Sequence, residues 1–250
     1  MPIFAVYRYF YRYFGFIGKN ADICSMNKAT ISADIVSSTS LNVEQRLILE
    51  KELKKLLRIL KQSFGSKTFF GRLIKGDYIE CVLNNPKDAL RVALIIKSFV
   101  KSLKIQANNK TNKKIQNFKE YGIRIAVGIG ELSILNRRKG IIDGEAIYLS
   151  GRAINEMTSS DKKIKNTLAF RSNQEDWNEA FAPLFSLLDV LFADSTRAQS
   201  EIILYKLLNK SEKEISEILK KSQSTINQHS TAAGWFAIDK AVKYFENQIK

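Results

Sequence analysis

Two aspartates stand at positions where carboxylates could bind a metal. Asp34 lies near the end of the β-branched apolar run Lys28–Val36, and Asp77 closes the tight turn Lys75-Gly76-Asp77. Carboxylate oxygens are ligands that Mg²⁺ accepts in proteins, and a pair of carboxylates can share two such ions. Either aspartate alone is commonly a turn or cap residue. The metal prediction therefore depends on whether the fold brings the two together.

Histidine and cysteine usage excludes several other kinds of site. The 250-residue chain has one histidine, His229, which excludes multi-histidine metal centres and leaves Ser-His-Asp or Cys-His catalysis only that residue. Its two cysteines, Cys24 and Cys81, lack the spacing of a disulfide framework or a thiolate zinc site, which favours a reducing cytoplasm. No apolar run approaches the roughly 18 residues of a membrane helix. Any catalysis must use carboxylates, metals and basic side chains.

Hydrophobic periodicity predicts the elements that would position the two aspartates. The predicted order is a strand at residues 28–36, an amphipathic helix at 44–62, a hairpin of strands at 68–74 and 78–83, a helix from residue 85 and a strand at 122–130. The lysine-rich stretch 104–119 is expected to be a solvated loop. The order βαββαβ is that of a ferredoxin-like α+β domain, a four-stranded antiparallel sheet with its helices on one face.

That topology predicts that Asp34 and Asp77 meet at one edge of the sheet. The first and second strands run parallel with the third between them, so the end of the first strand and the hairpin turn lie together. The two carboxylates are then expected to bind two Mg²⁺ or Mn²⁺ ions. The loop after Asp34 can offer backbone N–H groups and hydroxyls to a nucleoside triphosphate. Its candidate residues are Ile35, Ser37, Ser38 and Thr39.

Four segments together resemble the active-site segments of class III nucleotidyl cyclases, over about residues 28–158. They are ADIVSSTSL, KGDYIECVL, GIRIAVGIGEL and DGEAIYLSGRAINEM. The resemblance implies that Asp34 and Asp77 are the metal ligands and that Arg152 stabilises the pentavalent phosphorus transition state from the partner subunit of a homodimer. A surface or interface salt bridge is the alternative role for Arg152.

Two positions depart from the pattern of that family. Tyr148 stands where the family has a transition-state asparagine, and a phenol cannot reproduce an amide. Leu73 stands where a base-reading lysine is expected, with Arg72 and Lys75 as imperfect substitutes, so the sequence does not identify the base. The loss of one preorganised donor typically costs about 10² to 10³ in rate. The resemblance therefore implies either a slow enzyme or a nucleotide sensor.

The C-terminal part is predicted to be almost entirely helical. A strand at residues 168–171 precedes a helix at 177–192 that is expected to connect two domains, and a helical pattern continues from Arg197. Ser211 and Glu214 form a capping-box pair at the start of one short helix, and a second helix begins near Ser222. Two short helices separated by a tight turn predict a helix-turn-helix.

The segment SEKEISEILKKSQSTINQHSTAAGW resembles the helix-turn-helix of sigma-factor region 4 and similar regulators. Its second helix is expected to contact DNA through side chains that can bind bases or phosphates, namely Gln223, Ser224, Thr225, Asn227 and Gln228. Lys220 and Lys221 replace the usual turn glycine, and residues 195–250 carry nine basic and six acidic side chains, a net charge of +3. A small helical bundle used for dimerisation or protein contact is the alternative.

The first 25 residues differ in composition from the rest of the chain. Residues 1–16 hold eight of the 26 aromatic residues, which indicates either an arm that binds a partner or membrane surface, or upstream sequence translated from an early start codon. We favour the second interpretation. The net charge of +15 favours nucleic-acid or nucleotide partners, although an AT-rich genome also produces chains rich in lysine, asparagine and isoleucine.

The sequence thus predicts three parts after the N-terminal extension. They are a cyclase-like nucleotide-binding domain at residues 26–175, a connecting helix at 176–196 and a helix-turn-helix DNA-binding domain at 197–250. Together they resemble bacterial cyclase-like proteins with an attached helix-turn-helix, including the SatD-like family. The leading interpretation is a cytoplasmic, homodimeric DNA-binding regulator whose first domain binds a nucleoside triphosphate with Mg²⁺. An active nucleotidyl cyclase and a non-catalytic dimerisation scaffold are the alternatives.

Overall fold

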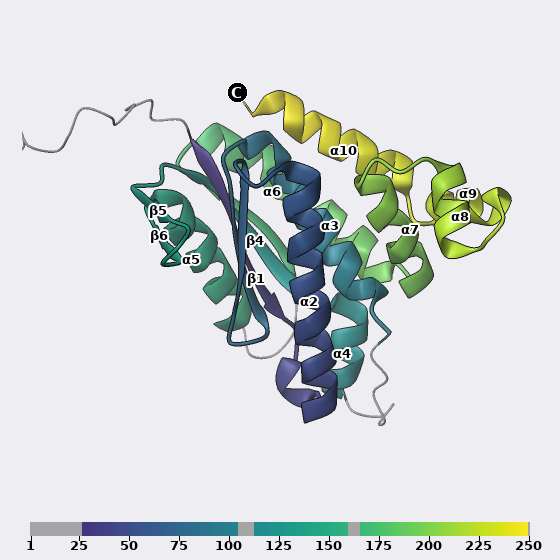
Figure 1. Ribbon diagram of the computed structural model, residues 1–250. Helices are drawn as coiled ribbons and strands as arrows, with labels where there is room; N and C mark the ends of the chain where they lie inside the picture. Colours follow the sequence, from purple (N-terminus) through teal and green to yellow (C-terminus); the bar gives the residue numbers. More distant parts are fainter. Residues whose placement is uncertain (1–26, 105–112, 160–165, 250) are drawn as a thin grey trace, which may run out of the picture.

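The structure is a computed structural model, and it describes residues 27–104, 113–159 and 166–249. Its larger part is a five-stranded sheet with helices on both faces, and α-helices follow it to the C-terminal end (Figure 1). The mixed α+β class expected from the sequence is confirmed. The N-terminal extension predicted at residues 1–25 lies outside the described residues.

The sheet has the strand order β2-β3-β1-β4-β7. Its strands are β1 (Lys28–Ile35), β2 (Phe69–Ile74), β3 (Tyr78–Leu83), β4 (Ile123–Gly130) and β7 (Leu168–Ser172). Because β3 pairs antiparallel with both β1 and β2, these two strands run parallel with β3 between them. On its other side β1 pairs antiparallel with β4. This order places the end of β1 beside the β2–β3 turn.

The helices and the remaining short strands complete the described residues. In chain order they are η1 (Ser38–Ser40), α2 (Val43–Phe64), η2 (Pro86–Asp88), α3 (Ala89–Ser102), α4 (Lys113–Tyr121), β5 (Ile134–Asn136), β6 (Ile141–Asp143), α5 (Glu145–Ser159), α6 (Glu175–Asp194), α7 (Arg197–Leu207), α8 (Glu212–Leu219), α9 (Gln223–Ala232) and α10 (Trp235–Gln248).

The sheet is larger than the four-stranded antiparallel sheet that the sequence predicts. A fifth strand, β7, pairs parallel with β4 at the edge. The connection between β4 and β7 contains α5. A crossover helix of this kind is the usual way in which two successive strands become parallel neighbours. The predicted strand at residues 168–171 is present as β7, but its pattern alone could not give its place in the sheet.

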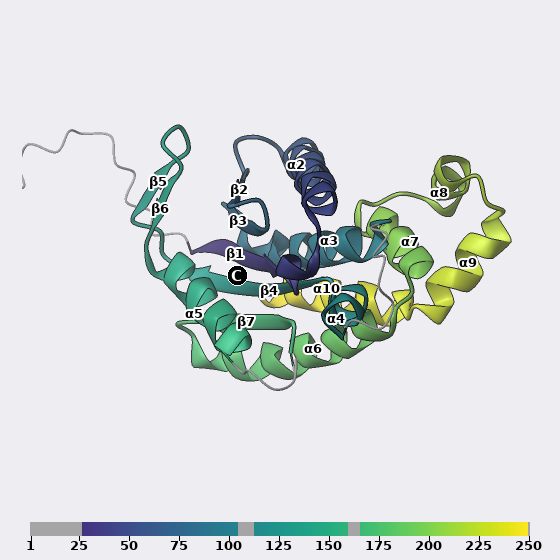
Figure 2. The same ribbon diagram turned by 90° about the horizontal axis from the view of Figure 1, so that it is seen from below.

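Helices cover both faces of the sheet: the two helices of the predicted βαββαβ order share one face as expected, and a further helix covers the other face. α2 and α3 pack on the apolar face, and α5 packs on the opposite face (Figure 2). The hydroxyls of Thr30 and Ser32 in β1 lie 3.0 and 2.9 Å from the hydroxyl of Ser150 in α5. Gly128 of β4 lets the backbone of α5 approach closely, since a Cβ at this position would lie 2.7 Å from the backbone nitrogen of Ser150. The α5 contact is thus partly polar, and an apolar pattern does not reveal it.

Two further elements differ from the expectation. Of the stretch 104–119, which is predicted as a solvated loop, residues 105–112 lie outside the described residues; from Lys113 the chain forms α4, which buries the side chain of Phe118 to 7% exposure. The many lysines of this segment mask its helical pattern, and the buried aromatic side chain packs the helix against the core. The β5–β6 hairpin projects away from the main sheet (Figure 2). Its three-residue strands are too short for periodicity to detect.

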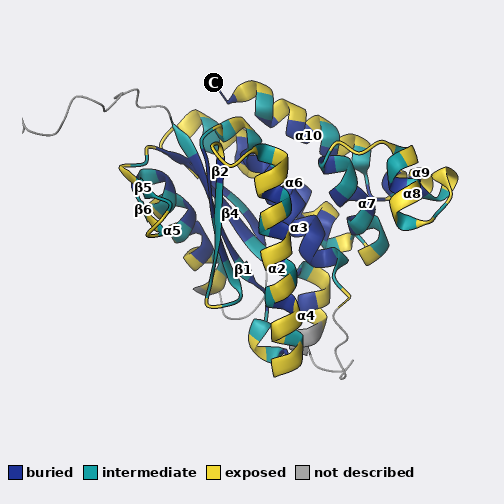
Figure 3. Ribbon diagram, viewed as in Figure 1, coloured by how far each residue is buried: buried dark blue, intermediate teal, exposed yellow. Residues whose placement is uncertain are grey.

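The hydrophobic core continues from the sheet into the C-terminal helices. Phe170 of β7 lies 5.1, 5.4 and 5.9 Å, between ring centroids, from Phe181 and Phe185 of α6 and Phe245 of α10. The buried residues accordingly form one continuous cluster that includes the sheet, α3, α6 and the C-terminal half of α7 (Figure 3). α10 therefore returns to the sheet unit rather than remaining with α8 and α9.

The helices α7, α8 and α9 share a separate small core at one end of the molecule. Ile202, Ile215 and Ile226 are buried together, one from each helix. The side chain of Ser211 accepts a hydrogen bond from the backbone N–H of Glu214, and the Glu214 carboxylate accepts one in return, which confirms the predicted capping box. Among all helices that the structure describes, none is long and apolar enough to cross a membrane.

Candidate functional site

Asp34 and Asp77 lie at the same end of the sheet. The backbone N–H of Ile35, the residue after Asp34, donates a hydrogen bond of 3.3 Å to the carbonyl oxygen of Asp77. In the β1–β3 register Asp34 is opposite Tyr78, which directly follows Asp77. The strand end and the turn therefore meet, as the predicted strand order requires.

Arg124 of β4 lies on the other side of Asp34. Its Nη1 is 3.5 Å from Oδ2 of Asp34, and the two residues are opposite each other in the β1–β4 register. Burial raises the pKa of Asp34 to about 6; the positive charge of Arg124 acts against this rise, and the negative charge of Asp77 adds to it. The Nε of Arg124 is buried and has no hydrogen-bond partner among the described residues. This guanidinium therefore retains donor capacity beside the aspartates.

The loop after Asp34 turns sharply toward the β2–β3 turn. Ser37 has a left-handed φ of 57°, and η1 follows it. The hydroxyl of Ser38 donates a hydrogen bond of 2.7 Å to Oδ2 of Asp77. The Ile35 side chain is buried in the core, so only its backbone is available to a ligand, whereas Thr39 is exposed. The loop and the Asp77 turn thus form one hydrogen-bonded unit.

Arg72 and Lys75, the predicted base-reading substitutes, have different surroundings. Arg72 lies opposite Glu80 and pairs with it, its Nε 2.8 Å from Oε2 of Glu80. Lys75 is exposed in the turn next to Asp77, with a left-handed φ of 52°. Arg72 is thus engaged within the sheet, and Lys75 is the cation on the turn itself.

The strand registers place a group of polar side chains on the same sheet face as the α5 contact. We call this group the polar face; its residues, all partly exposed, are Asp34, Arg72, Tyr78, Glu80 and Arg124. Tyr78, Glu80 and Arg124 were not among the site residues expected from the sequence. Their signal is the alternation of Tyr78 and Glu80 with apolar residues in β3, and the single Arg124 between two isoleucines in β4, which is typical of strands with one buried and one accessible face.

Tyr148 and Arg152 lie one helical turn apart on α5, and both are at least partly exposed. Tyr148 is 58% exposed, and its hydroxyl donates a hydrogen bond of 2.6 Å to Oδ1 of Asp143. This hydrogen bond raises the pKa of Tyr148. Within the described ranges, no hydrogen bond or ion pair connects Tyr148 or Arg152 with Asp34 or Asp77. Within one chain, therefore, Tyr148 and Arg152 do not interact directly with the two aspartates.

The metal-binding capacity of the site rests on two carboxylates. In the part of the chain that the structure describes, no group of three or more His, Cys, Asp or Glu side chains could hold a metal ion. Mg²⁺ is usually bound by one or two carboxylates together with waters and substrate phosphates. Asp34 and Asp77 fit this mode, because a backbone hydrogen bond joins their two segments and the negative charge of Asp77 acts on the Asp34 carboxyl, whose pKa burial raises. They do not form an all-protein cage.

The predicted DNA-contacting residues lie in the first turns of α9. Gln223, Ser224, Asn227 and Gln228 are exposed. Thr225 is partly exposed, and its backbone N–H donates a 3.1 Å hydrogen bond to the hydroxyl of Ser222, which caps the helix. α9 lies at the end of the molecule away from α5 (Figures 1 and 2), and the amide and hydroxyl side chains of its first turns are at least partly exposed.

No protein-family model and no curated protein matches this sequence. Among solved structures, the chain is similar to one of a bacterial light-regulated adenylyl cyclase, with 18% identity, a TM-score of 0.42 and coverage of 58% of this chain and 74% of that chain. A second structure, also of a bacterial light-regulated adenylyl cyclase, gives 20% identity, a TM-score of 0.38 and coverage of 58% and 43%. At this level of similarity, a functional proposal must rest on the residues of this chain.

Proposed function

We propose that this protein binds a nucleoside triphosphate with divalent cations at Asp34 and Asp77 and, as a homodimer, converts it to a cyclic nucleotide and pyrophosphate. The observation that carries the proposal is the hydrogen bond from the Ile35 N–H to the Asp77 carbonyl, which joins the two aspartate-bearing segments at one end of the sheet. The order of strands produces this juxtaposition from residues 43 positions apart.

The immediate surroundings of the aspartates support an anionic ligand that arrives with a cation. Two carboxylates at the same end of the sheet would by themselves repel a triphosphate, so bound Mg²⁺ or Mn²⁺ is needed to neutralise them. When bound, such ions polarise phosphate oxygens and lower the pKa of a coordinated hydroxyl. Arg124 and Lys75 add positive charge on either side of the pair.

The protein's own groups would orient the nucleotide. The N–H groups and hydroxyls of the Ser37, Ser38 and Thr39 loop lie next to Asp77 and can donate hydrogen bonds to phosphate oxygens. Ser38 already donates to Asp77, so a ligand that recruits this hydroxyl must release that hydrogen bond. A cyclisation further requires that the ribose 3′-hydroxyl lie in line with the α-phosphorus, which is a matter of positioning.

A second copy of the chain is required because one chain does not bring Arg152 to the aspartates. Arg152 is exposed on α5, and its guanidinium could stabilise negative charge on the phosphoryl group of a partner's nucleotide. Tyr148, one turn earlier, offers one hydroxyl in place of an amide, and that hydroxyl donates to Asp143. We therefore expect a turnover about 10² to 10³ below that of a site with an amide donor.

The proposed activity can be tested with purified full-length protein, each of the four nucleoside triphosphates, and Mn²⁺ or Mg²⁺. The wild-type protein should form a cyclic nucleotide from at least one of them, and Asp34→Ala and Asp77→Ala should each abolish it. Asp176→Ala, which removes an exposed carboxylate in the first turn of α6, is the matched control and should retain activity. A wild-type rate equal to that of the Asp34→Ala protein would reject the cyclase.

We also propose, as a second function, that α9 binds DNA. The observation that favours it is the separate core of α7, α8 and α9, which fixes α9 while its amide-bearing side stays exposed. Amides of Asn227 and Gln228 can bind an adenine edge, and Lys220 and Lys221 in the preceding turn can approach phosphates. With a C-terminal net charge of only +3, binding should be modest per subunit.

DNA binding can be tested by mobility shift on genomic fragments, with and without nucleotide. Replacing both Asn227 and Gln228 by alanine should relax sequence preference by roughly 1–3 kcal/mol for each base that the protein no longer recognises. Asn247→Ala removes an exposed amide from α10 and is the matched control. Wild-type binding that is independent of sequence and unaffected by the double substitution would reject the DNA-recognition proposal.

A further inference from the structure

A cavity lies where the sheet unit meets the start of the C-terminal helices. It has a volume of about 480 Å³ and is formed by the C-terminal end of α3, by α4 and by the link between α6 and α7. Volumes of this size are within the range of small-molecule sites, roughly 300–1,000 Å³. The cavity is separate from Asp34 and Asp77, since neither aspartate lines it.

Four basic side chains line this cavity. They are Lys101, Lys104, Lys119 and Arg197. Within the described part of the chain, none of the four forms an ion pair with a carboxylate, although ten other ion pairs are present there. The carboxylates of Glu120, Asp194 and Asp189 act on Lys101, but none of them forms an ion pair with the four cations, whose remaining positive charge an anion would relieve.

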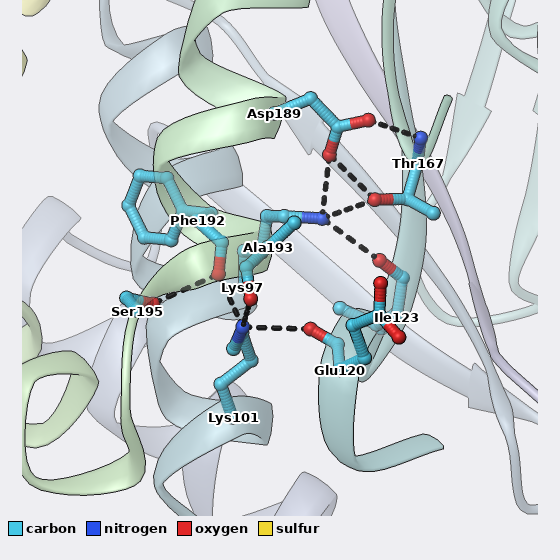
Figure 4. Close-up of polar contacts among 9 residues, drawn as sticks. All are labelled: Lys97, Lys101, Glu120, Ile123, Thr167, Asp189, Phe192, Ala193 and Ser195. Atoms are coloured by element: carbon cyan, nitrogen blue, oxygen red, sulfur yellow. Dashed lines mark hydrogen bonds and ion pairs between the residues drawn. The ribbon is translucent and has the colours of Figure 1, made fainter. Parts of the chain in front are cut away.

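Lys101 is the buried member of the four, and the other three are exposed. It is 8% exposed, and its ammonium group donates to the backbone carbonyl oxygens of Glu120, Phe192 and Ala193, which caps the C-terminal end of α6 (Figure 4). Burial, together with the charge of Lys97 one turn earlier, lowers the pKa of Lys101 to about 8. Asp189, a nearby carboxylate, is paired with Lys97 instead.

The link between α6 and α7 adds donors to the same cavity. Thr196 caps α7, and its hydroxyl accepts the N–H of Gln199 at 3.3 Å. The first N–H groups of the helix, from Arg197 onward, have no acceptor inside the helix, and the helix dipole favours an anion there. The cavity also has an apolar wall, which consists of Val100, Leu103 and Phe118.

We propose that this cavity binds a nucleoside phosphate, independently of the site at Asp34 and Asp77. The phosphate groups are bound by the exposed cations Lys104, Lys119 and Arg197, and the buried Lys101 adds positive charge. The base or sugar packs against the apolar wall. Phosphate bound by lysine and arginine needs no metal, which separates this site chemically from the carboxylate pair. The ligand contacts α3, α4 and the start of α7, so its binding would stiffen the junction that leads to α8 and α9.

The test is titration calorimetry of the full-length protein with ADP and with pyrophosphate, both in EDTA so that the carboxylate site lacks a metal. We expect ADP to bind the wild-type protein, and Lys104→Gln, Lys119→Gln and Arg197→Gln combined to weaken it at least about tenfold. The charge-matched control combines Lys54→Gln, Lys61→Gln and Arg138→Gln, three exposed positions outside the cavity, and should bind ADP like the wild type. Circular dichroism and thermal unfolding should show that both variants are folded.

Three results would overturn the proposal. They are absence of ADP binding at millimolar concentration, equal ADP affinity in the two triple variants, and loss of ADP binding in an Asp34→Ala, Asp77→Ala protein. Pyrophosphate that binds as tightly as ADP would overturn the assignment of a nucleoside to the apolar wall. ADP binding retained in the double-alanine protein supports the junction site even if no cyclase activity is found.

Discussion

Nη1 of Arg124 lies 3.5 Å from Oδ2 of Asp34, so a cation on β4 partly compensates a carboxylate that burial destabilises. Without Arg124, the same burial and the negative charge of Asp77 would act unopposed. The arginine is thus a positioning and charge-balancing partner of Asp34, located 90 residues later in the chain.

The titration of Asp34 should report this balance in the metal-free protein. The wild-type carboxyl should titrate with a pKa of about 6. Arg124→Leu removes a charge that favours the carboxylate, so the pKa should rise. Asp77→Asn removes a charge that disfavours it, so the pKa should fall. Carbon-detected NMR of the Asp34 carboxyl measures all three values, and an unchanged pKa in both variants would show that the three groups are not coupled.

The close approach of α5 to β4 predicts opposite effects for two glycines. A Cβ at Gly128 would collide with the carbonyl oxygen of Ala146 and lie 2.7 Å from the backbone nitrogen of Ser150. Gly128→Ala should therefore destabilise the protein by about 1–3 kcal/mol or more. Gly151→Ala, inside α5 with no atom within 4 Å of the added Cβ, should stabilise it by about 0.5–1 kcal/mol. Urea unfolding distinguishes the two, and equal effects would contradict the observed packing.

Removing one partner of the buried Lys97–Asp189 pair should lower the free energy of unfolding more than replacing both partners. Lys97 is fully buried, its Nζ is 3.0 Å from Oδ1 of Asp189, and it also donates to Thr167 (Figure 4). Asp189→Asn leaves an uncompensated buried ammonium, which costs about 3–5 kcal/mol. Lys97→Met with Asp189→Leu should recover most of that loss. A double variant less stable than Asp189→Asn by denaturant unfolding would contradict this.

Lys101 should make the free energy of unfolding depend on pH in the alkaline range. Because its pKa is lowered to about 8 in the folded state, the unfolded chain binds more protons between pH 8 and the ordinary lysine pKa of 10.5. Its contribution to stability therefore rises with pH across that window and is constant below it. The free energy of unfolding of the wild type, relative to Lys101→Met, should increase between pH 7.5 and pH 10. A constant difference would show that burial does not perturb this lysine.

The sequence could predict the meeting of Asp34 and Asp77 because it depends only on strand order. Each strand around them has a strong β-branched or alternating pattern, and the short Lys75-Gly76-Asp77 turn leaves little freedom for the hairpin. The start of α8 could also be predicted, because its capping box is formed by two residues close in the sequence, Ser211 and Glu214.

The remaining features depend on contacts between distant residues. Arg124 becomes a partner of Asp34 only through the β1–β4 register, and α5 reaches the second face through hydroxyl contacts of Thr30 and Ser32, which no hydrophobic pattern signals. The lysine-rich α4 buries Phe118 in the hydrophobic core, a contact that its local sequence does not signal. Such tertiary effects override local propensity.

The central claim is that Asp34 and Asp77 together hold a divalent cation with a nucleotide, and the electron paramagnetic resonance signal of free Mn²⁺ tests it most directly. Titrating Mn²⁺ into the wild-type protein with a non-hydrolysable nucleoside triphosphate should reduce the free signal beyond what the nucleotide alone causes. The Asp34→Asn, Asp77→Asn protein should show only the effect of the nucleotide. Identical free Mn²⁺ in the two proteins, for all four bases, would contradict the account.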